Sequence, residues 1–263
     1  TLTSEKKFEE RVITRVELKN KIVLITGAAV RVGRVTALAL AEQGCHIVIT
    51  YLSEAEPYQA TAAQIEAKGV EVLALPLNVQ TPGDPARVVA AAVERFGRID
   101  LLVNNASVWL KAPFLEITEE AWRSALEINL TGPFLMSQAV APHMLKQKSG
   151  LIVNITDLSA YQTWPGYAPH SASKAGLVTL TRVMAAELAP HIRVNAIAPG
   201  TVLLPDNADE AKAQWAVENS LLKRVGTPED VARTVIFLAE NDFVTGAVYF
   251  VDGGRALVGM SGA

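Results

Sequence analysis

The sequence predicts an α/β protein built on a doubly wound parallel sheet. Short apolar runs rich in β-branched residues alternate with amphipathic stretches of helical length, and no shift in composition divides the chain. The first run, residues 22–25, is too short for a helix and is soon followed by a glycine. Because such an alternation produces right-handed crossovers between parallel strands, we expect a single domain of about seven strands, with helices on both faces of the sheet.

Glycine and proline mark the elements of the first half. The first helix should end before Gly44 and the second before Gly69, while Pro85 suits the first turn of the third. The expected helices are residues 32–43, 56–68 and 85–96. The expected strands are residues 22–25, 46–50, 70–75 and 99–103.

A longer helical pattern and further crossovers make up the second half. Pro133 and Pro142 lie inside the longest pattern, and we expect them to bend that helix. Thr227 suits the N-cap of the last helix, and Pro228 suits its first turn. The expected helices are residues 119–146, 171–188, 209–218 and 228–240. The expected strands are residues 151–155, 193–197 and 247–251.

Composition narrows the class of protein. The chain has 263 residues, half of them hydrophobic, which is enough for one large core. The net charge of −3 gives no electrostatic footprint for nucleic acid, and no apolar run is long enough to cross a membrane. Residues 1–19 lack the apolar core of an export signal, so we expect an N-terminal extension before a cytoplasmic domain over residues 20–263. The single cysteine, Cys45, excludes an internal disulfide, fits a reducing compartment and is expected in the core.

The turn after the first strand has the features of an anion site. Gly27 permits a tight turn, and Gly33 permits the following helix to pack closely on the strand. The N–H groups and positive dipole end of that helix suit a pyrophosphate. Arg31 stands where a third glycine is common, as either a solvated side chain or a cation directed at a cofactor phosphate. We favour the second interpretation because its forked donors match phosphate oxygens.

Chemically active side chains follow other strands. In a doubly wound sheet the ligand lies beyond the carboxyl ends of the strands, where the strand order reverses. Asn104 and Asn105 follow the fourth strand, either to hold a turn or to contact a ribose. Asp157 leaves the fifth strand, and His170 and Lys174 stand four residues apart near the start of a helix. We therefore expect an acid, an imidazole and an amine in one crevice.

These motifs resemble the short-chain dehydrogenase/reductase family over residues 20–257. The pattern Thr-Gly-x-x-x-Arg-x-Gly at residues 26–33 and the aspartate at position 157 are similar to the pteridine reductase branch. The resemblance implies a single-domain Rossmann-type fold, NADP(H) as cofactor, reduction of dihydropteridines, a cytosolic location and a homotetramer. The matching stretches are Thr26-Gly27 with Gly33, Asn104-Asn105-Ala106, Asn129, Ser173-Lys174, Pro199-Gly200, Thr245-Gly246 and Asp252-Gly253-Gly254.

The resemblance also implies roles for single residues. The implied catalytic group is Asp157, His170, Lys174 and Asn129, with Lys174 on the nicotinamide ribose and Asn129 carrying a water that links Lys174 to solvent. The residues implied in cofactor binding are Gly27, Arg31, Val32, Gly33, Tyr51, Ser53, Asn78, Asn105, Ala106, Ser107, Lys174, Pro199 and Gly200. No metal ligand is implied.

Two departures from the family pattern bear on catalysis. Asp157 stands in place of the usual serine and His170 in place of the usual tyrosine. A neutral imidazole is a weak acid, so His170 can donate a proton only as imidazolium, a charge that Asp157 favours and Lys174 disfavours. Either Asp157 orients and charges His170, or Asp157 is itself the donor with a pKa raised by burial. Tyr167 would need a shift of one helical turn to supply the missing hydroxyl.

The expected function follows from these residues. No acid stands at residues 51–53 to hold a ribose diol, whereas Ser53 and Arg31 could receive a 2′-phosphate, so we expect NADP(H). The expected reaction is hydride transfer to a C=N or C=O carbon of a pteridine-like or small carbonyl compound. The tryptophans that either line the pocket or pack in the core or on the surface are Trp109, Trp164 and Trp215. The alternative is a dinucleotide-binding sensor or scaffold with little or no activity, because the tyrosine is missing.

Overall fold

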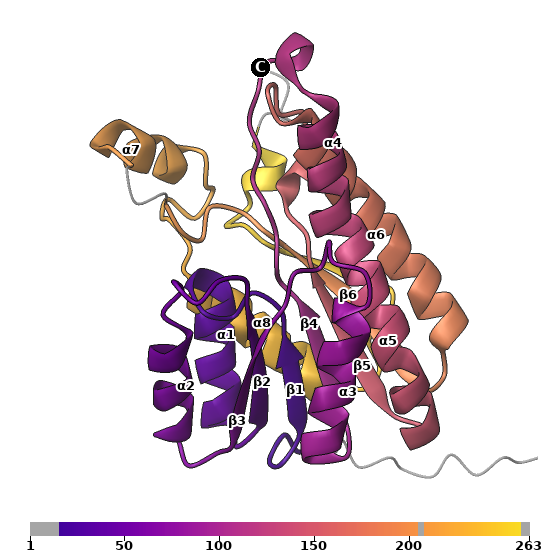
Figure 1. The fold of residues 1–263 in the computed structure, drawn as a ribbon. Helices are drawn as coiled ribbons and strands as arrows, with labels where there is room; N and C mark the ends of the chain where they lie inside the picture. The colour runs from indigo at the N-terminus through magenta and orange to yellow at the C-terminus, as the bar shows by residue number, and fades with distance from the viewer. Residues whose placement is uncertain (1–15, 205–207, 259–263) are drawn as a thin grey trace, which may run out of the picture.

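The computed structural model describes residues 16–204 and 208–258 and confirms the predicted architecture (Figure 1). All strand pairs are parallel, and the sheet order is β3-β2-β1-β4-β5-β6-β7. The strands are β1 (Ile22–Ile25), β2 (His46–Tyr51), β3 (Val72–Pro76), β4 (Leu101–Asn104), β5 (Gly150–Ile155), β6 (Ile192–Pro199) and β7 (Val248–Val251). Because the order reverses between β1 and β4, the crevice beyond their carboxyl ends is where a ligand is expected.

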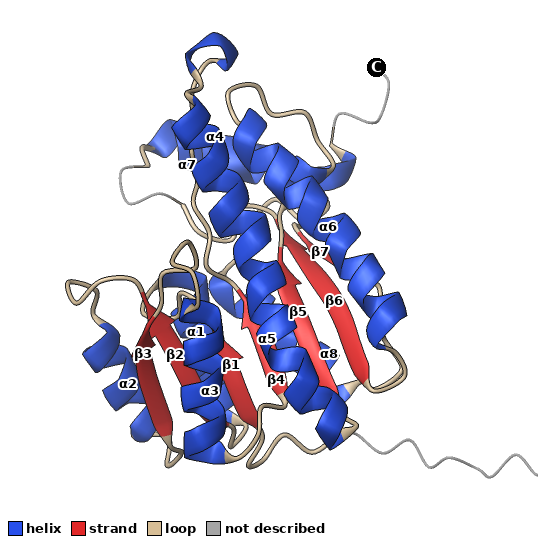
Figure 2. Cartoon of the chain, turned by 45° about the vertical axis from the view of Figure 1, so that its right-hand side comes forward, coloured by secondary structure: helices blue, strands red, loops and turns tan. Residues whose placement is uncertain are grey.

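Helices cover both faces of the sheet (Figure 2). One face carries α1 (Arg31–Glu42), α2 (Tyr58–Glu66) and α8 (Pro228–Glu240). The other face carries α3 (Asp84–Phe96), α5 (Gly132–Gln147) and α6 (Ala168–Leu188). Two shorter helices, α4 (Glu119–Leu126) and α7 (Glu210–Glu218), lie beyond the carboxyl ends of the strands, where Figure 1 shows them above the sheet.

The core has one cluster of apolar side chains on each face of the sheet. Along β1, Val23 and Ile25 belong to one cluster, and Ile22 and Leu24 belong to the other. Successive side chains of a strand point to opposite faces, so a strand covered on both faces reads as a continuous apolar run. This packing explains why four consecutive apolar residues form a strand here.

The longest helical pattern forms two helices joined by an irregular turn, which differs from the expected single bent helix. A π-helical turn, Glu127–Thr131, joins α4 to α5. Pro133 lies in the first turn of α5, and Pro142 lies inside that helix. Since Pro133 has no N–H to donate to the carbonyl four residues earlier, the regular ladder is interrupted just before it. The turn carries Asn129, whose side chain is fully buried and takes part in the site described below.

Other element ends differ from the expected ones by a few residues. The helix α6 begins at Ala168 instead of residue 171, and α2 begins at Tyr58, directly after a proline, instead of residue 56. The last long helix spans Pro228–Glu240 as expected, and Thr227 forms a capping box with Asp230. None of the helices in the described parts of the chain has the length and apolarity that a membrane span needs.

The described part of the N-terminal extension packs on the domain. The N–H of Val16 donates to the carbonyl of Glu240 (3.2 Å), and Leu18 is buried in the core. Cys45 is also fully buried, as predicted, and its Sγ donates to the carbonyl of Leu18 (3.3 Å). The rest of the predicted N-terminal extension, residues 1–15, lies outside the described residues.

Candidate active site

The turn after β1 has the geometry of a phosphate-binding loop. Gly27 has a φ of +62°, and a Cβ on Gly33 would lie only 2.5 Å from the Gly27 carbonyl oxygen. Arg31 and Val32 open α1, a helix of 12 residues without a side-chain N-cap and without an acidic residue in its first turn. The dipole and the first N–H groups of α1 are therefore not neutralised by a side chain of the helix itself, which suits an anion.

The segment after β4 is tied to this turn by hydrogen bonds. Asn105 Nδ2 donates to the carbonyl oxygens of Thr26 (2.9 Å) and Gly27 (3.0 Å). Thr26 Oγ1 accepts from the N–H groups of Asn105 and Ala106, both at 3.0 Å. The side chain of Asn104 points into the core and donates to Asn154 Oδ1 (2.8 Å). Both asparagines thus hold the fold together, which is the first of the two interpretations of this pair.

At the end of β2, two tyrosines hold the first acidic side chain. The rings of Tyr51 and Tyr58 are stacked with centroids 3.7 Å apart, and their hydroxyls donate to the carboxylate of Glu54 at 2.9 and 2.6 Å. These hydrogen bonds, that of Tyr58 first, lower the pKa of Glu54. Ser53 Oγ accepts from the N–H of Ala55 (3.2 Å). Glu56 also lies near the expected ribose site, where its Oε1 accepts from the N–H groups of Leu52 (2.9 Å) and Ser53 (3.2 Å). Both acids are therefore engaged by their own neighbours.

The remaining predicted cofactor residues also lie beyond the carboxyl ends of strands. Asn78 follows β3, and its side-chain oxygen accepts a backbone N–H within its own turn (3.0 Å). Pro199 ends β6, and a Cβ on the next residue, Gly200, would lie 2.8 Å from Asp252. Ser107 Oγ donates to Asn129 Oδ1 (3.0 Å) and so belongs to the polar cluster around the predicted catalytic residues.

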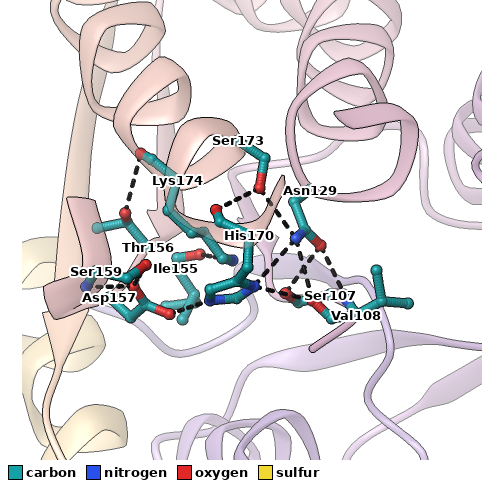
Figure 3. Close-up of polar contacts among 10 residues, drawn as sticks. All are labelled: Ser107, Val108, Asn129, Ile155, Thr156, Asp157, Ser159, His170, Ser173 and Lys174. Atoms are coloured by element: carbon teal, nitrogen blue, oxygen red, sulfur yellow. Dashed lines mark hydrogen bonds and ion pairs between the residues drawn. The ribbon is translucent and has the colours of Figure 1, made fainter. Parts of the chain in front are cut away.

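Asp157, His170 and Lys174 come together beyond the end of β5, as predicted (Figure 3). Asp157 caps the short helix η3 (Leu158–Ala160), where its Oδ1 accepts from the N–H and the hydroxyl of Ser159 at 2.8 and 2.5 Å. Asp157 Oδ2 contacts Nε2 of His170. Lys174 lies one turn further along α6, and its Nζ donates to the carbonyl of Ile155 (2.9 Å).

The hydrogen-bond network determines which atoms of His170 carry protons. Asn129 Oδ1 accepts from the N–H of Val108 (2.9 Å), which sets the orientation of the amide. Asn129 Nδ2 then donates its two hydrogens to the carbonyl of Val108 and to Ser173 Oγ, both at 3.1 Å. It has none left for His170 Nδ1, which lies 3.3 Å away. Since His170 Nδ1 also lies 3.0 Å from the carbonyl of Val108, this nitrogen is the donor and carries a hydrogen.

Asp157 and His170 consequently share a second proton. A carboxyl group facing Nε2 requires either an imidazolium with a carboxylate or a neutral imidazole with a carboxylic acid. Burial raises the pKa of Asp157, but the hydrogen bond from His170 and the charge of Lys174 outweigh it and hold that pKa below its usual range. This direction favours the carboxylate with the imidazolium. Burial lowers the pKa of Lys174 to about 8, against the opposing charge of Asp157, so the amine is still mainly protonated at neutral pH.

The side chain of Asp157 is the more exposed of the pair. The side chain of His170 is 1% exposed and both of its nitrogens are engaged, whereas that of Asp157 is 11% exposed. Asp157 is thus the more exposed of the two donors that the sequence left open, but its pKa is lowered and not raised as expected, so it could donate only a proton that it receives from His170. His170 is placed to orient and to protonate it.

An aromatic wall adjoins the pair. Trp109 lies 4.5 Å from the ring of His170, 5.6 Å from that of Trp164 and 5.1 Å from that of Tyr167, measured between centroids. Two of the three predicted tryptophans thus gather beside the imidazole, and the third, Trp215, lies on α7. Tyr167 precedes α6 and packs edge-on against Trp109, so it belongs to the wall and not to the polar cluster.

Three contributors to the site were not predicted from the sequence. Ser159 could have been found, because a serine two residues after an aspartate that leaves a strand is typical of a side-chain-capped turn. Ser173 was noted only as part of a motif. Val108 contributes through its backbone N–H and carbonyl, and a backbone group leaves no signal in residue type.

A comparison with known proteins identifies the family. A family model described as enoyl-(acyl carrier protein) reductase matches residues 27–256, which is most of the chain. The chain belongs to the short-chain dehydrogenase/reductase family. Its fellow members are NAD(P)(H)-dependent oxidoreductases, which agrees with the glycine turn and the uncapped start of α1.

Individual relatives of this short-chain dehydrogenase/reductase cover nearly its whole length. A 3-oxoacyl-(acyl-carrier-protein) reductase from Synechocystis is 38% identical over 244 residues, which cover 91% of this chain and 98% of the relative. The human dehydrogenase/reductase SDR family member 4 is 36% identical, with 90% and 88% covered. The crystal structure of acetoin dehydrogenase from Enterobacter cloacae superposes with a TM-score of 0.85 at 34% identity, with 93% and 98% covered.

Proposed function

We propose that this short-chain dehydrogenase/reductase uses NADPH to reduce a C=O or C=N group, with Asp157 as the proton donor and His170 as the residue that protonates Asp157. The observation that carries this proposal is the contact of Asp157 Oδ2 with His170 Nε2, beside Lys174, while His170 Nδ1 faces the carbonyl of Val108. A retuned acid–base pair of this kind is what proton delivery to a heteroatom requires.

The residues at the switch point fit a dinucleotide. A Cβ at Gly27 would press on the backbone of Ala106, and a Cβ at Gly33 would collide with the Gly27 carbonyl, so both glycines keep the turn close to the start of α1, which is not capped by a side chain. NADPH is favoured over NADH because Glu54 is engaged by two phenol hydroxyls, whereas Arg31 stands at the helix start. When bound, the nicotinamide supplies the hydride. The protonated Lys174 would hold its ribose.

Proton delivery follows from the state of the pair. As negative charge develops on the substrate heteroatom, the proton on His170 Nε2 passes to Asp157 Oδ2, and Asp157 gives a proton to the heteroatom. His170 is left neutral with its hydrogen on Nδ1, still donated to the Val108 carbonyl. The charge of Lys174 stabilises the carboxylate that remains, and the partly exposed Asp157 can take up the next proton from solvent.

The proposed substrate is pteridine-like or a small carbonyl compound. The pteridine class is supported by the pattern at residues 26–33 together with Asp157, and by the flat face of Trp109 beside the pair. The carbonyl class is supported by relatives whose names state action on oxo groups, such as the 3-oxoacyl-(acyl-carrier-protein) reductase.

The test is steady-state NADPH oxidation with dihydrobiopterin, dihydrofolate and a panel of ketones and quinones. In Asp157→Asn and His170→Ala we expect kcat to fall by about 10²- to 10⁴-fold, the range for a lost general acid, with the Kd of NADPH unchanged. Glu71→Gln is the matched control, because Glu71 directly precedes β3 at the opposite edge of the sheet and its side chain is half exposed.

The outcomes of this test distinguish a reductase from a dinucleotide-binding protein without catalytic activity. If the unaltered protein reduces a compound of the panel and Asp157→Asn reduces it at a similar rate, Asp157 is not the proton donor. NADPH binding without turnover of any compound in the panel would instead support a dinucleotide-binding sensor or scaffold.

A further inference from the structure

Arg255 is held between two tryptophans at the rim of the site. It opens the short helix η4 (Arg255–Leu257), which follows β7. Its guanidinium carbon lies 5.2 Å from the ring centre of Trp164 and 4.6 Å from that of Trp215. A guanidinium nitrogen donates to Thr201 Oγ1 (2.7 Å), and Gln162 Nε2 donates to the Arg255 carbonyl (3.2 Å). The cation is therefore fixed in place by contacts from three other segments of the chain.

This position belongs to the same wall as the proton donor. Trp164 packs against Trp109, which in turn packs against His170. Burial lowers the pKa of Arg255, and the negative charges of Asp252 and Asp157 oppose that shift. The carboxylate of Asp157 therefore interacts electrostatically with the guanidinium. A planar compound lying along Trp109 with its reacting group at Asp157 would therefore extend toward Arg255.

The guanidinium retains donors for a ligand. Among the described residues no carboxylate forms an ion pair with Arg255; the nearby carboxylate of Asp252 instead accepts from the N–H groups of Gly254 (2.9 Å) and Ala256 (2.7 Å). An arginine has five N–H donors, and the hydrogen bond to Thr201 uses one of them. Aromatic rings contact the face of a guanidinium, whereas its N–H groups point outward in its plane.

We infer that Arg255 is a specificity-determining residue that binds an oxyanion of the substrate, a carboxylate or a phosphate, while Trp109 and Trp164 contact the planar part of the same molecule. This inference rests on the proposed function and narrows its substrate to planar oxo or imino compounds with an acidic group. A half-buried cation with a forked set of donors is the arrangement that binds such groups in bidentate fashion.

Binding of non-reacting analogues tests this inference. The NADP⁺-loaded protein is titrated with phenylbutanoate, phenylpropyl phosphate and the neutral phenylbutanamide, and tryptophan fluorescence reports binding. We expect Arg255→Met to weaken binding of the preferred anion by about 10- to 100-fold and to leave the amide unchanged. The affinity of Arg255→Lys for the anion should lie between those of the unaltered protein and Arg255→Met, because lysine retains the positive charge but lacks the forked donors of arginine. A preference for the phosphate over the carboxylate, or the reverse, would identify the oxyanion.

Controls separate recognition from folding. Arg123→Met removes the same charge from an exposed ion pair on α4 and should change no affinity. The Kd of NADP⁺ and the midpoint of thermal unfolding should be the same in Arg255→Met as in the unaltered protein. Equal binding of anions and amide by the unaltered protein, or an equal loss of both in the variant, would overturn the inference.

A kinetic experiment distinguishes this inference from the proposed function. With benzoylpropionate and its methyl ester as substrates, Arg255→Met should raise KM for the acid alone and leave kcat within about twofold. If neither ketone is reduced while anion-selective binding persists, the reductase proposal fails and the anion site stands. If both are reduced with the same KM change, the anion site fails and the reductase proposal stands.

Discussion

Lys174 is a buried cation, and its state depends on pH. Burial shifts its pKa from the ordinary 10.5 to about 8 in the folded protein. Between these two values the unfolded chain binds more protons at this residue than the folded chain does. The contribution of Lys174 to the free energy of unfolding therefore rises as pH rises from about 8 to 10.5, and the charged form is destabilising below pH 8.

The variant Lys174→Met isolates this effect. We expect the free energy of unfolding of the unaltered protein, minus that of the variant, to increase by up to about 3 kcal/mol between pH 7 and pH 10. Urea unfolding of both proteins at each pH gives this difference, and the titration of residues that do not interact with Lys174 cancels in it. Parallel curves for the two proteins would show that Lys174 is not a buried cation.

Residue types predicted the members of the site better than their roles. Asp157, His170 and Lys174 were expected together because they lie at the carboxyl end of one strand and on one helix face. Which nitrogen of His170 donates a hydrogen bond is determined by the backbone carbonyl of Val108. A backbone carbonyl is present in every residue, so the residue type gives no signal for this contact. Arg255 had no signal either, since its partners lie in three other segments and only the folded chain assembles them.

Among the elements, α1 shows why a glycine inside a helix is retained. Alanine is the better helix former by about 1 kcal/mol. A Cβ at Gly33 would, however, lie 2.5 Å from the Gly27 carbonyl oxygen and 2.9 Å from Ala28 Cα, and these backbone atoms cannot rotate away. The steric overlap therefore outweighs the gain in helix propensity.

We expect Gly33→Ala to destabilise the protein by about 1–3 kcal/mol and to weaken NADPH binding more than tenfold, because the phosphate turn must move. Chemical denaturation and a fluorescence titration measure the two effects. Gln43→Ala, at the exposed end of the same helix, should change stability by less than about 0.5 kcal/mol. A Gly33→Ala protein with unchanged stability and affinity would refute the close packing described for α1.

Periodicity predicted the elements but not the π-helical turn. Apolar runs bounded by glycine identified each strand, and the cap and proline identified the start of α8. Over the five residues of Glu127–Thr131, the wider spacing of a π turn cannot be distinguished from an α-helix by pattern. The turn is stabilised by contacts of Asn129 with Val108 and Ser173, which come from other parts of the chain.

For the whole molecule, the last strand presents an apolar edge. Within residues 16–204 and 208–258, β7 pairs with β6 alone, and Phe250 on β7 and Phe237 on α8 are 44% and 43% exposed. Exposed aromatic side chains beside an unpaired strand edge are typical of a contact between subunits. We propose that this edge forms one interface of the homotetramer implied by the family resemblance.

Sedimentation equilibrium tests the assembly. We expect a mass near four times the 28.2 kDa of the chain at micromolar concentration. Phe250→Glu should lower this mass to that of a dimer or monomer, because it places charges on both sides of a two-fold interface. Leu115→Glu, at a residue 95% exposed on η1 (Phe114–Glu116), should leave the mass unchanged. A monomer in the unaltered protein would contradict the proposal.

The burial of the single cysteine allows its rate of alkylation to report local or global unfolding of the protein. Only a thiolate reacts with alkylating reagents, and burial raises the pKa of Cys45 to about 12. The carbonyl that accepts its S–H belongs to Leu18, a buried residue of the N-terminal segment that packs against the sulfur atom. Alkylation can then proceed only while this N-terminal segment has detached or the whole domain has unfolded, and its slow rate under native conditions measures how often that happens, with no introduced label.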